Sequence, residues 1–234
     1  MKEKFFKFYA IFSIAGIVFY IVNLIWGEDP RDGKMGLFIN ILGLSCMVLN
    51  LLLSVTCLKN YKKSRYRDIY FAGGCFWGTE KYFKLLDGVV ETEVGYANGN
   101  TEDPTYEQVY TDTTGYAECV HVRFDSNVTT VRRLTEMYFK AIDPTSLNQQ
   151  GEDKGTRYRT GVYYVDPDRQ GVGSVLKQVF DEQSRIYGKL AVELMPLKNF
   201  VRAEDYHQDY LDKNPGGYCH LSPEIFEYAR RQGK

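Results

Sequence analysis

The sequence predicts a mixed α/β domain in residues 66–234 that follows a pair of membrane-spanning helices in residues 1–65. Two long uncharged segments near the N-terminus predict the helices, and strand-like and helix-like patterns that alternate after residue 66 predict the domain. Hydrophobic residues make up 44% of the 234 residues and aromatic residues 15%, which excludes a disordered chain. The net charge of −1 argues against a dedicated nucleic-acid-binding protein, so no nucleic-acid partner is expected.

The first 65 residues are predicted to anchor the chain in membrane lipid. Residues 8–27 and 35–58 contain no charged side chain, and about 20 apolar residues suffice to cross the hydrocarbon core. A polar, turn-forming loop at residues 28–34 separates them, as in a helical hairpin. The alternative is a cleaved signal peptide. However, the first segment is longer than the usual apolar region, lacks a small-residue cleavage motif and is followed by a second span.

Basic residues around the two spans predict the orientation of this hairpin. Three lysines precede the first span and five lysines or arginines follow the second, whereas the loop between them holds two basic residues. Cytoplasmic flanks of membrane helices carry the excess of Lys and Arg, so both ends of the hairpin are expected on the cytoplasmic side. We therefore predict a multi-pass protein of the cell membrane whose folded domain faces the reducing cytosol, where structural disulfides are disfavoured.

The folded domain is predicted from hydrophobic periodicity, read in chain order. The strands are expected at residues 68–72, 91–97, 119–124, 161–165 and 192–197. The helices are expected at residues 76–86, 130–142, 172–187, 203–212 and 223–231. Gly73-Gly74 ends the first strand, Thr129-Thr130 can cap the second helix, and Gly188 stops the third. No repeat or linker interrupts the series, so residues 66–234 are expected to form one domain.

One cysteine has a sequence context that favours reactivity. Cys46 and Cys57 lie in the second span and are interpreted as apolar fillers. Cys75 stands in a glycine-rich break, Gly-Gly-Cys-Phe-Trp-Gly, between a predicted strand and the start of a predicted helix. The free N–H groups and the dipole at a helix N-terminus favour the thiolate, which is the nucleophilic form. The alternative is a buried cysteine at a tight turn.

The same segment resembles the signature of the peptide methionine sulfoxide reductase A family, at Gly74-Cys75-Phe76-Trp77-Gly78. Further blocks resemble the family in its own order, at residues 94–96, 104–106, 115–118, 151–159 and 203–208. The likeness covers about residues 69–220 and does not include the hairpin; Tyr116 stands where many members carry His. It implies a two-layer α/β sandwich with a ferredoxin-like core. It also implies an oxidoreductase that needs no cofactor and reduces the S epimer of methionine sulfoxide, free or in proteins.

The resemblance implies a role for each residue of these blocks. Cys75 is expected to attack the sulfoxide sulfur while Glu118 protonates the departing oxygen. A glutamate can serve as an acid near neutral pH only if burial raises its pKa. The alternative for Glu118 is an ordinary surface carboxylate without a catalytic role. Two tyrosines are expected to hydrogen-bond the oxygen, an aspartate to position the substrate, and two aromatic side chains to enclose the S-methyl group. These substrate-binding residues are Tyr106, Tyr158, Asp153, Phe76 and Trp77.

A second cysteine is expected to complete the cycle. Attack leaves Cys75 as a sulfenic acid, which condenses readily with a nearby thiol. Cys219 follows a Pro- and Gly-containing loop and resembles the resolving-cysteine segment of the family, which implies thioredoxin as the reductant of the resulting disulfide. Cys119 directly follows Glu118 on a predicted strand, so it should point to the opposite face and lie in the core.

Other functions of these residues are a thiol hydrolase, a redox sensor and a metal site. His207, with Asp205 or Glu204, leaves open a Cys-His thiol hydrolase. The Cys75 and Cys219 pair is also compatible with a membrane redox sensor that does not turn over. A metal site is not expected, because the histidines at 121, 207 and 220 show no paired ligand spacing with the cysteines.

Overall fold

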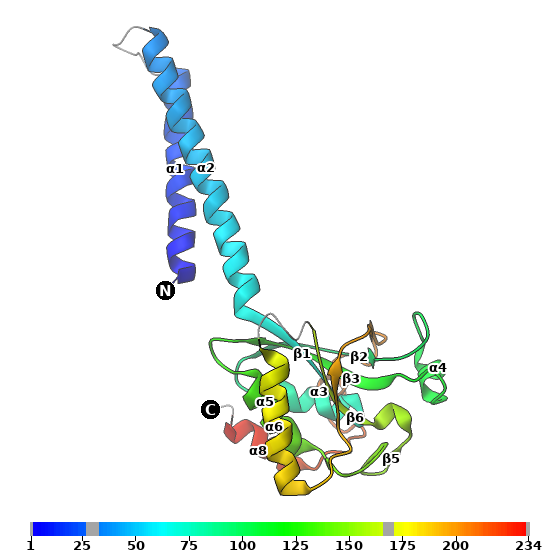
Figure 1. Ribbon diagram of the computed structural model, residues 1–234. Helices are drawn as coiled ribbons and strands as arrows, with labels where there is room; N and C mark the ends of the chain where they lie inside the picture. The colour runs from blue at the N-terminus through cyan, green and yellow to red at the C-terminus, as the bar shows by residue number, and fades with distance from the viewer. Residues whose placement is uncertain (1, 27–32, 166–170, 233–234) are drawn as a thin grey trace. The chain divides into compact units, whose positions relative to one another are not determined.

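The chain folds into two compact units, residues 1–65 and residues 66–234 (Figure 1). They are seen in a computed structural model that describes residues 2–26, 33–165 and 171–232. The predicted loop at residues 28–34 lies largely outside the described residues, as does the predicted end of the first span at residue 27.

The first unit is a pair of long helices, α1 (Lys2–Trp26) and α2 (Gly33–Arg65). Within them, Lys2–Asn23 and Leu37–Tyr61 are long and apolar enough to cross a membrane. Their large apolar side chains are mostly exposed; Phe8 is 65% exposed and Leu52 is 60% exposed. Apolar surface of this extent is unfavourable in water, which is consistent with the predicted anchor.

Small residues let α1 and α2 approach each other closely. A Cβ atom at Gly43 would lie 2.3 Å from Cζ of Tyr20, and one at Gly16 would lie 2.8 Å from Sδ of Met47. Such contacts are typical of helices that pack within a bilayer, where small residues allow close backbone approach. At one end of the pair, Glu3 accepts a hydrogen bond from Arg65 at 3.2 Å.

The second unit is built on a ferredoxin-like βαββαβ core, as the resemblance implied. Its four strands lie in the order β6-β1-β3-β2 and pair antiparallel throughout. The two helices of this core follow β1 and β3 in sequence. The six elements are β1 (Tyr66–Gly73), α3 (Phe76–Lys84), β2 (Val89–Ala97), β3 (Ala117–Asp125), α5 (Val131–Ala141) and β6 (Thr160–Tyr164).

Two further strands extend this sheet at its edges, and short elements complete the unit. β7 (Glu193–Pro196) pairs parallel to β6, and β8 (Phe200–Arg202) pairs antiparallel to β2. The two-residue strands β4 (Gln149–Gln150) and β5 (Asp153–Lys154) pair only with each other. The remaining elements are α4 (Tyr106–Tyr110), the 3-10 helix η1 (Thr156–Tyr158), α6 (Val172–Tyr187), α7 (Tyr210–Lys213) and α8 (Pro223–Gln232).

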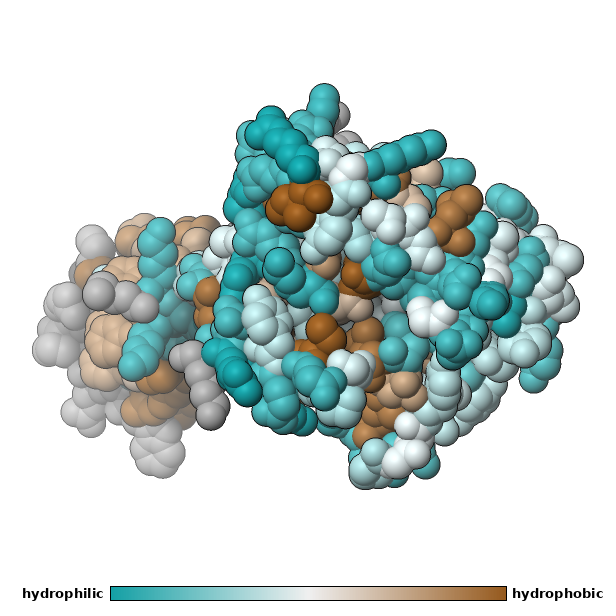
Figure 2. All heavy atoms as spheres, turned by 90° about the horizontal axis from the view of Figure 1, so that it is seen from below, coloured by the Kyte–Doolittle hydropathy of each residue, from teal (hydrophilic) through white to brown (hydrophobic). Residues whose placement is uncertain are grey.

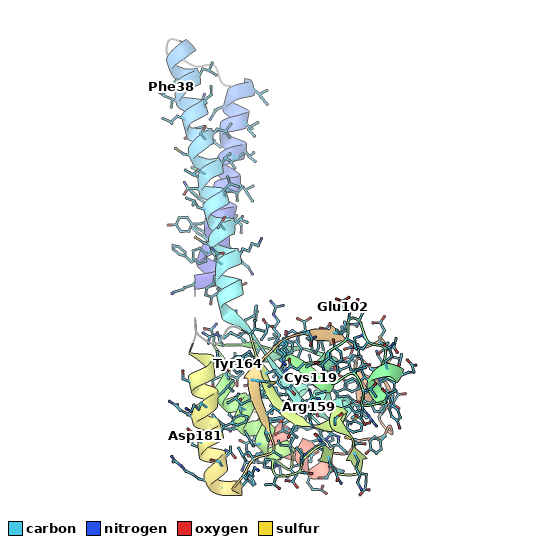
Figure 3. The ribbon with its side chains drawn as sticks, turned by 45° about the vertical axis from the view of Figure 1, so that its right-hand side comes forward. Phe38, Glu102, Cys119, Arg159, Tyr164 and Asp181 are labelled. Atoms are coloured by element: carbon cyan, nitrogen blue, oxygen red, sulfur yellow. The ribbon has the colours of Figure 1, made fainter. Side chains whose placement is uncertain are left out.

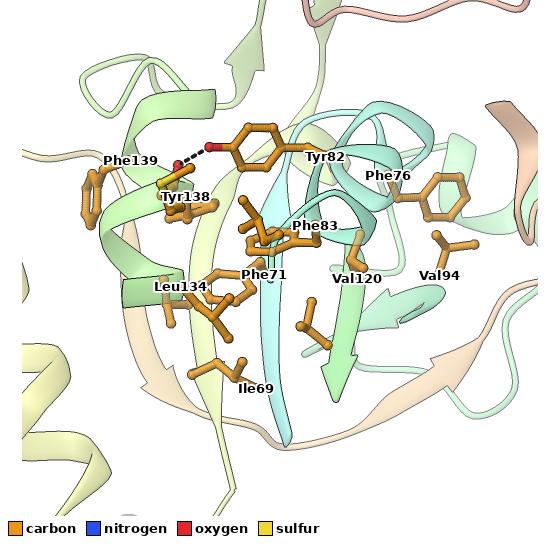
Figure 4. Close-up of a cluster of buried hydrophobic side chains, with 14 of the residues drawn as sticks. Ile69, Phe71, Phe76, Tyr82, Phe83, Val94, Val120, Leu134, Tyr138 and Phe139 are labelled. Carbon is orange, nitrogen blue, oxygen red and sulfur yellow. Dashed lines mark hydrogen bonds between the residues drawn. The ribbon is translucent and has the colours of Figure 1, made fainter. Parts of the chain in front are cut away.

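The main core lies between the sheet and helices α3 and α5 (Figure 4). Phe71 of β1 stacks on Phe83 of α3 at 4.4 Å between ring centroids and contacts Tyr138 of α5 at 5.1 Å. The hydroxyl of Tyr82 donates to the carbonyl oxygen of Met137 at 2.8 Å and so links α3 to α5. The face of this unit seen in Figure 2 is mostly hydrophilic, with apolar residues in small separate patches.

A smaller apolar cluster, formed by Ala72, Ala97, Ala117, Cys119 and Tyr163, is separate from the main core. Cys119 is fully buried in it, among the strands of the sheet (Figure 3). Successive strand residues point to opposite faces, so Glu118 points the other way, toward α3. The placement expected for Cys119 is confirmed.

The helix predicted at residues 203–212 is wrong. Only residues 210–213 are helical, because the segment before them uses its polar groups to bind strand β2. The amide of Gln208 accepts from the Val94 N–H at 2.9 Å and donates to the Val94 carbonyl oxygen at 2.9 Å. Asp209 then takes a left-handed conformation with φ of 57°, which an α-helix does not allow. Tertiary hydrogen bonds therefore override a helix-like sequence pattern.

Deleting residues 1–65 should release a folded unit, because residues 66–234 contain the complete six-stranded sheet and its core. We expect this fragment to be soluble without detergent. Its thermal unfolding, followed by circular dichroism, should be cooperative, with a midpoint within a few degrees of that of the same unit in the detergent-solubilised full chain. A fragment that aggregates or melts without a cooperative transition would contradict the prediction.

Candidate active site

Cys75 lies at the junction of β1 and α3, directly before the first helical residue. The turn needs glycine at position 74, where φ is 78° and a Cβ would come within 2.7 Å of Cβ of Gln150. The thiol is only 5% exposed. The structure therefore places the cysteine at a helix N-terminus, as predicted, and also buries it in a tight turn, which was the alternative.

The electrostatic surroundings of this thiol differ from the simple expectation. Burial raises the pKa of Cys75 well above its usual value, and the neighbouring Glu118 carboxyl raises it further. The backbone N–H groups of Trp77 and Gly78 hydrogen-bond the sulfur and lower its pKa, but they do not outweigh burial. The helix N-terminus thus lowers the pKa of Cys75, as expected. Burial has the larger effect, so the free protein holds a neutral thiol.

Glu118 of β3 is the second buried titratable group of the site. It is 1% exposed, and its Oε2 accepts the backbone N–H of Phe76 at 3.0 Å. Burial raises the pKa of this carboxyl to about 8, against the lowering effects of that hydrogen bond and of the Arg157 guanidinium. At neutral pH the carboxyl is therefore mostly protonated and able to donate a proton. The alternative of a surface carboxylate is wrong.

The two predicted tyrosines, Tyr106 and Tyr158, lie close enough to Glu118 for its carboxyl to affect their pKa values. Burial raises the pKa of the hydroxyls of Tyr106 and Tyr158, and the Glu118 carboxyl adds to the rise in both. Both hydroxyls therefore stay protonated and remain hydrogen-bond donors. Arg157 lies over the Tyr158 ring at 4.4 Å, and its guanidinium is paired with Asp112 at 2.7 Å. The ion pair with Asp112 holds the Arg157 guanidinium over the Tyr158 ring.

Aromatic rings form the wall beside Cys75. Phe76 is 1% exposed, whereas Trp77 is partly exposed and stacks on Tyr210 at 3.8 Å between ring centroids. Nε1 of Trp77 donates to Nδ1 of His207 at 3.1 Å, and this bond sets the tautomer of the imidazole. Phe76 also contacts the His207 ring at 5.1 Å. His207 therefore supports the wall.

The C-terminal segment from Tyr218 to His220 lies close to Cys75. The hydroxyl of Tyr218 donates to Oδ1 of Asp153 at 2.9 Å. Sγ of Cys219 lies against the first turn of α3, where a Cβ at Gly78 would be only 2.9 Å away. A ring nitrogen of His220 lies within 4.8 Å of Sγ of Cys75 and of a carboxylate oxygen of Asp153. The predicted residues Cys75, Asp153 and Cys219 are thus brought together by the fold.

Three residues, Glu204, Arg157 and His220, contribute to the site in ways that the sequence did not predict. Glu204 accepts the Tyr96 hydroxyl at 2.7 Å and the Tyr106 backbone N–H at 2.8 Å, so it positions α4. Glu204 and Arg157 both stand in blocks that resemble the family, but only the fold shows their partners. His220 carries no spacing signal, because its neighbours in the site come from distant parts of the chain.

The hydrogen bonds around His207 do not favour a thiol hydrolase built on this residue. Nδ1 of His207 accepts from Trp77, and the Glu204 carboxylate, 4.0 Å from Nε2 of His207, accepts from two other donors. Asp205 pairs with Arg202 at 2.6 Å instead of orienting the imidazole.

Tyr116, which stands where many family members carry His, is buried in the core. Its hydroxyl donates to the carbonyl oxygen of Thr101 at 2.6 Å.

Comparison with known proteins identifies relatives of residues 66–234. The family model described as peptide methionine sulfoxide reductase matches residues 67–233. The chain is 53% identical to the peptide methionine sulfoxide reductase MsrA of Clostridium acetobutylicum over 161 residues, 69% of this chain and 98% of that protein. The MsrA of Lachnoclostridium phytofermentans is 47% identical over 165 residues, 70% of this chain and 98% of that protein.

Solved structures agree with this result. Reduced Mxr1 from Saccharomyces cerevisiae superimposes with a TM-score of 0.62 at 41% identity, and the match covers 67% of this chain and 90% of that one. Methionine sulfoxide reductase A of Corynebacterium diphtheriae gives a TM-score of 0.62 at 36% identity, over 66% of this chain and 77% of that one.

The raised pKa of Glu118 predicts a specific loss of stability with rising pH. Between about 4.5 and about 8 the unfolded chain has released this proton while the folded protein keeps it. The free energy of unfolding should therefore fall with pH in this window, by up to about 1.4 kcal/mol per unit. Glu118→Gln removes the titration, so the stability of wild type relative to Glu118→Gln should decline from pH 5 to pH 8 in urea unfolding. A constant difference would contradict the buried acid; Glu107→Gln, at an exposed side chain, is the control.

Proposed function

The chain belongs to the peptide methionine sulfoxide reductase family, and from this premise we propose that it reduces the S epimer of methionine sulfoxide, free or in proteins, at a cell membrane. The observation that carries the catalytic proposal is the contact between Glu118 and the helix turn that holds Cys75. The carboxyl of Glu118 accepts the N–H of Phe76, the residue next to the thiol, at 3.0 Å. An acid and a nucleophile thus share one buried site.

In the proposed reaction the Cys75 sulfur attacks the sulfoxide sulfur and forms an S–S bond. The protonated oxygen then leaves the substrate sulfur and bonds the Cys75 sulfur while the S–S bond breaks, so the products are a sulfenic acid on Cys75 and methionine. Glu118 donates a proton to the oxygen as it leaves the substrate, and the thiol proton of Cys75 restores the acid. The protons balance because one thiol and one sulfoxide give one sulfenic acid and one sulfide.

The substrate would lie against the aromatic wall beside Cys75. The hydroxyls of Tyr106 and Tyr158 would donate to the sulfoxide oxygen, because their raised pKa keeps them protonated. Phe76 and Trp77 would enclose the S-methyl group, since aromatic faces pack well against sulfur and methyl groups. Asp153 would accept a hydrogen bond from the substrate backbone at Oδ2, while its Oδ1 keeps the hydrogen bond from Tyr218.

Cys219 is the proposed resolving thiol. Its attack on the sulfenic acid forms a disulfide with Cys75 and releases water. The residue borders a groove of about 590 Å³ that has apolar walls at Leu211, Pro215, Leu221 and Phe226. We propose that a dithiol protein such as thioredoxin covers this groove and reduces the disulfide by thiol exchange.

Residues 1–65 are the proposed membrane anchor, with the catalytic unit on the cytoplasmic side. Two observations support it: the exposed apolar side chains of α1 and α2, and the excess of basic residues that flank the two spans. The segments Lys2–Asn23 and Leu37–Tyr61 are each long enough for one crossing.

The site favours an enzyme over a redox sensor that lacks turnover. A thiol that senses oxidants directly is typically exposed and has a low pKa. Cys75 has a low exposure, and burial raises the pKa of its thiol. A buried neutral thiol beside a buried acid is better suited to a bound substrate than to a freely diffusing oxidant.

The proposed acid role predicts a large loss of rate in Glu118→Gln. General acid catalysis contributes about 10² to 10⁴ in rate, so reduction of a methionine sulfoxide peptide at pH 7 should fall within this range. Assays with separated epimers should show turnover of the S epimer alone in wild type. Glu107→Gln, at an exposed side chain, is the matched control. A Glu118→Gln protein with more than half the wild-type rate would refute the role.

The two remaining cysteines of the catalytic unit should behave differently. Cys219→Ser should release one methionine per enzyme, leave a sulfenic acid on Cys75 that dimedone traps, and fail to turn over with thioredoxin. Cys119→Ser should turn over, since Cys119 is buried in the smaller cluster away from Glu118. Cys75→Ser should release no methionine even in a single turnover. Normal turnover by Cys219→Ser would show that another thiol resolves the sulfenic acid.

The proposed topology predicts the behaviour of paired reporters. Green fluorescent protein fused after Lys234 should fluoresce, and alkaline phosphatase at the same position should be inactive, because this end is expected in the cytoplasm. Alkaline phosphatase inserted between residues 28 and 34 should be active. The reverse pattern would place the catalytic unit outside the cytoplasm and would refute the proposed orientation.

A further inference from the structure

Three side chains from distant parts of the chain meet at Cys75. Sγ of Cys75, a carboxylate oxygen of Asp153 and a ring nitrogen of His220 all lie within 4.8 Å of one another. Cys75 begins α3, Asp153 belongs to β5, and His220 precedes α8. A thiol, a carboxylate and an imidazole are the three side-chain types that most often bind zinc.

Two of these groups each have one bonded atom and one free atom. Oδ1 of Asp153 accepts the Tyr218 hydroxyl at 2.9 Å, whereas its Oδ2 is buried and has no hydrogen-bond partner among the described residues. Nε2 of His220 lies 3.0 Å from the Gly73 carbonyl oxygen, whereas its Nδ1 is buried and likewise has no partner in the part of the chain that the structure describes. A carbonyl oxygen can only accept, so Nε2 carries the proton and Nδ1 carries the lone pair.

These second contacts are the kind that orient ligands in metal sites. A zinc-bound histidine commonly donates its other N–H to a carbonyl or carboxylate oxygen, which fixes the ring and its tautomer. Here the Gly73 carbonyl oxygen holds the His220 ring, and the Tyr218 hydroxyl holds the Asp153 carboxylate. Unpartnered buried polar atoms are unfavourable, and coordination of a cation would satisfy both of them at once.

We propose that the reduced protein binds one Zn²⁺ ion through Sγ of Cys75, Oδ2 of Asp153 and Nδ1 of His220. Zinc accepts sulfur, nitrogen and oxygen ligands at about 2.0 to 2.3 Å, and three protein ligands leave the fourth tetrahedral position for water. Ligand atoms around tetrahedral zinc are about 3.5 Å apart, so atoms that lie within 4.8 Å of one another need to approach by at most about 1.3 Å. Binding converts the Cys75 thiol to a bound thiolate and releases its proton.

Such an ion would control the activity of the site. The metal holds the electron pair with which Cys75 attacks, and it occupies the space in front of the sulfur. Zinc should therefore inhibit sulfoxide reduction reversibly while protecting Cys75 from alkylation and oxidation. Once Cys75 is a sulfenic acid or part of a disulfide, it can no longer bind zinc as a thiolate, so the ion binds only the reduced enzyme.

Direct metal binding tests this inference without an activity assay. Reduced full-length protein in detergent should take one Zn²⁺ per chain from a chromophoric chelator. Co²⁺ in place of zinc should show tetrahedral visible bands and a thiolate-to-metal charge-transfer band of one sulfur ligand. Protein whose Cys75 has been alkylated or oxidised before the metal is added should give neither signal.

Substitutions in the trio distinguish this site from other ligands. Cys75→Ser should abolish the charge-transfer band, and Asp153→Asn and His220→Gln should each weaken zinc binding at least tenfold. Glutamine at 220 can still donate to the Gly73 carbonyl oxygen, so it removes the ligand atom with little structural change. His121→Gln is the matched control, since His121 bonds Asp68 elsewhere on the sheet.

Two results would overturn the assignment. Unchanged zinc affinity in His220→Gln and Asp153→Asn would exclude these side chains as ligands. Loss of binding in Cys219→Ser, with Asp153→Asn unaffected, would show a dithiol site between Cys75 and Cys219 instead. Because stoichiometry and spectra are read on the protein itself, neither result depends on the proposed reductase cycle.

Discussion

The buried carboxyl of Glu118 is the constraint on which the rest of the catalytic unit depends. A carboxyl that is 1% exposed and accepts a single backbone N–H cannot easily carry a charge, so its pKa rises to about 8. That N–H belongs to Phe76, the first helical residue after Cys75. Strand β3 and the N-terminus of α3 must therefore meet at one point, and the ferredoxin-like core brings them there.

Burial has a second effect, on the pKa of Cys75, the proposed nucleophile. The helix N-terminus lowers the pKa of Cys75 through two N–H groups, while burial raises it more strongly. The free site consequently holds a neutral thiol and a neutral acid side by side, with two neutral tyrosine hydroxyls nearby. A sulfoxide is a neutral, strongly polar ligand, so it can enter this site without bringing a charge that would have to be desolvated.

Most of the fold could be predicted from the sequence because periodicity reports burial, and burial decides strands β1 and β3 and helices α5 and α6. The segment at residues 203–209 could not, since the Gln208 amide binds strand β2, more than a hundred residues earlier in the chain. In the candidate site, Cys75 could be identified from its glycine-rich segment, and Glu118 from a block that resembles the family. His220 has no such sequence pattern, because only the fold brings it near Cys75 and Asp153.

The segment from Tyr218 to His220 links the steps of the proposed cycle. Tyr218 bonds Asp153, Cys219 lies against the first turn of α3, and His220 bonds the carbonyl oxygen of Gly73. The Tyr218 hydroxyl occupies Oδ1 of Asp153, whereas Oδ2 has no hydrogen-bond partner among the described residues, so the proposed substrate contact can form at Oδ2 without displacing Tyr218. The proposed substrate contact and the proposed resolving thiol are therefore linked through Tyr218, the residue next to Cys219, whose hydrogen bond holds this segment beside Asp153.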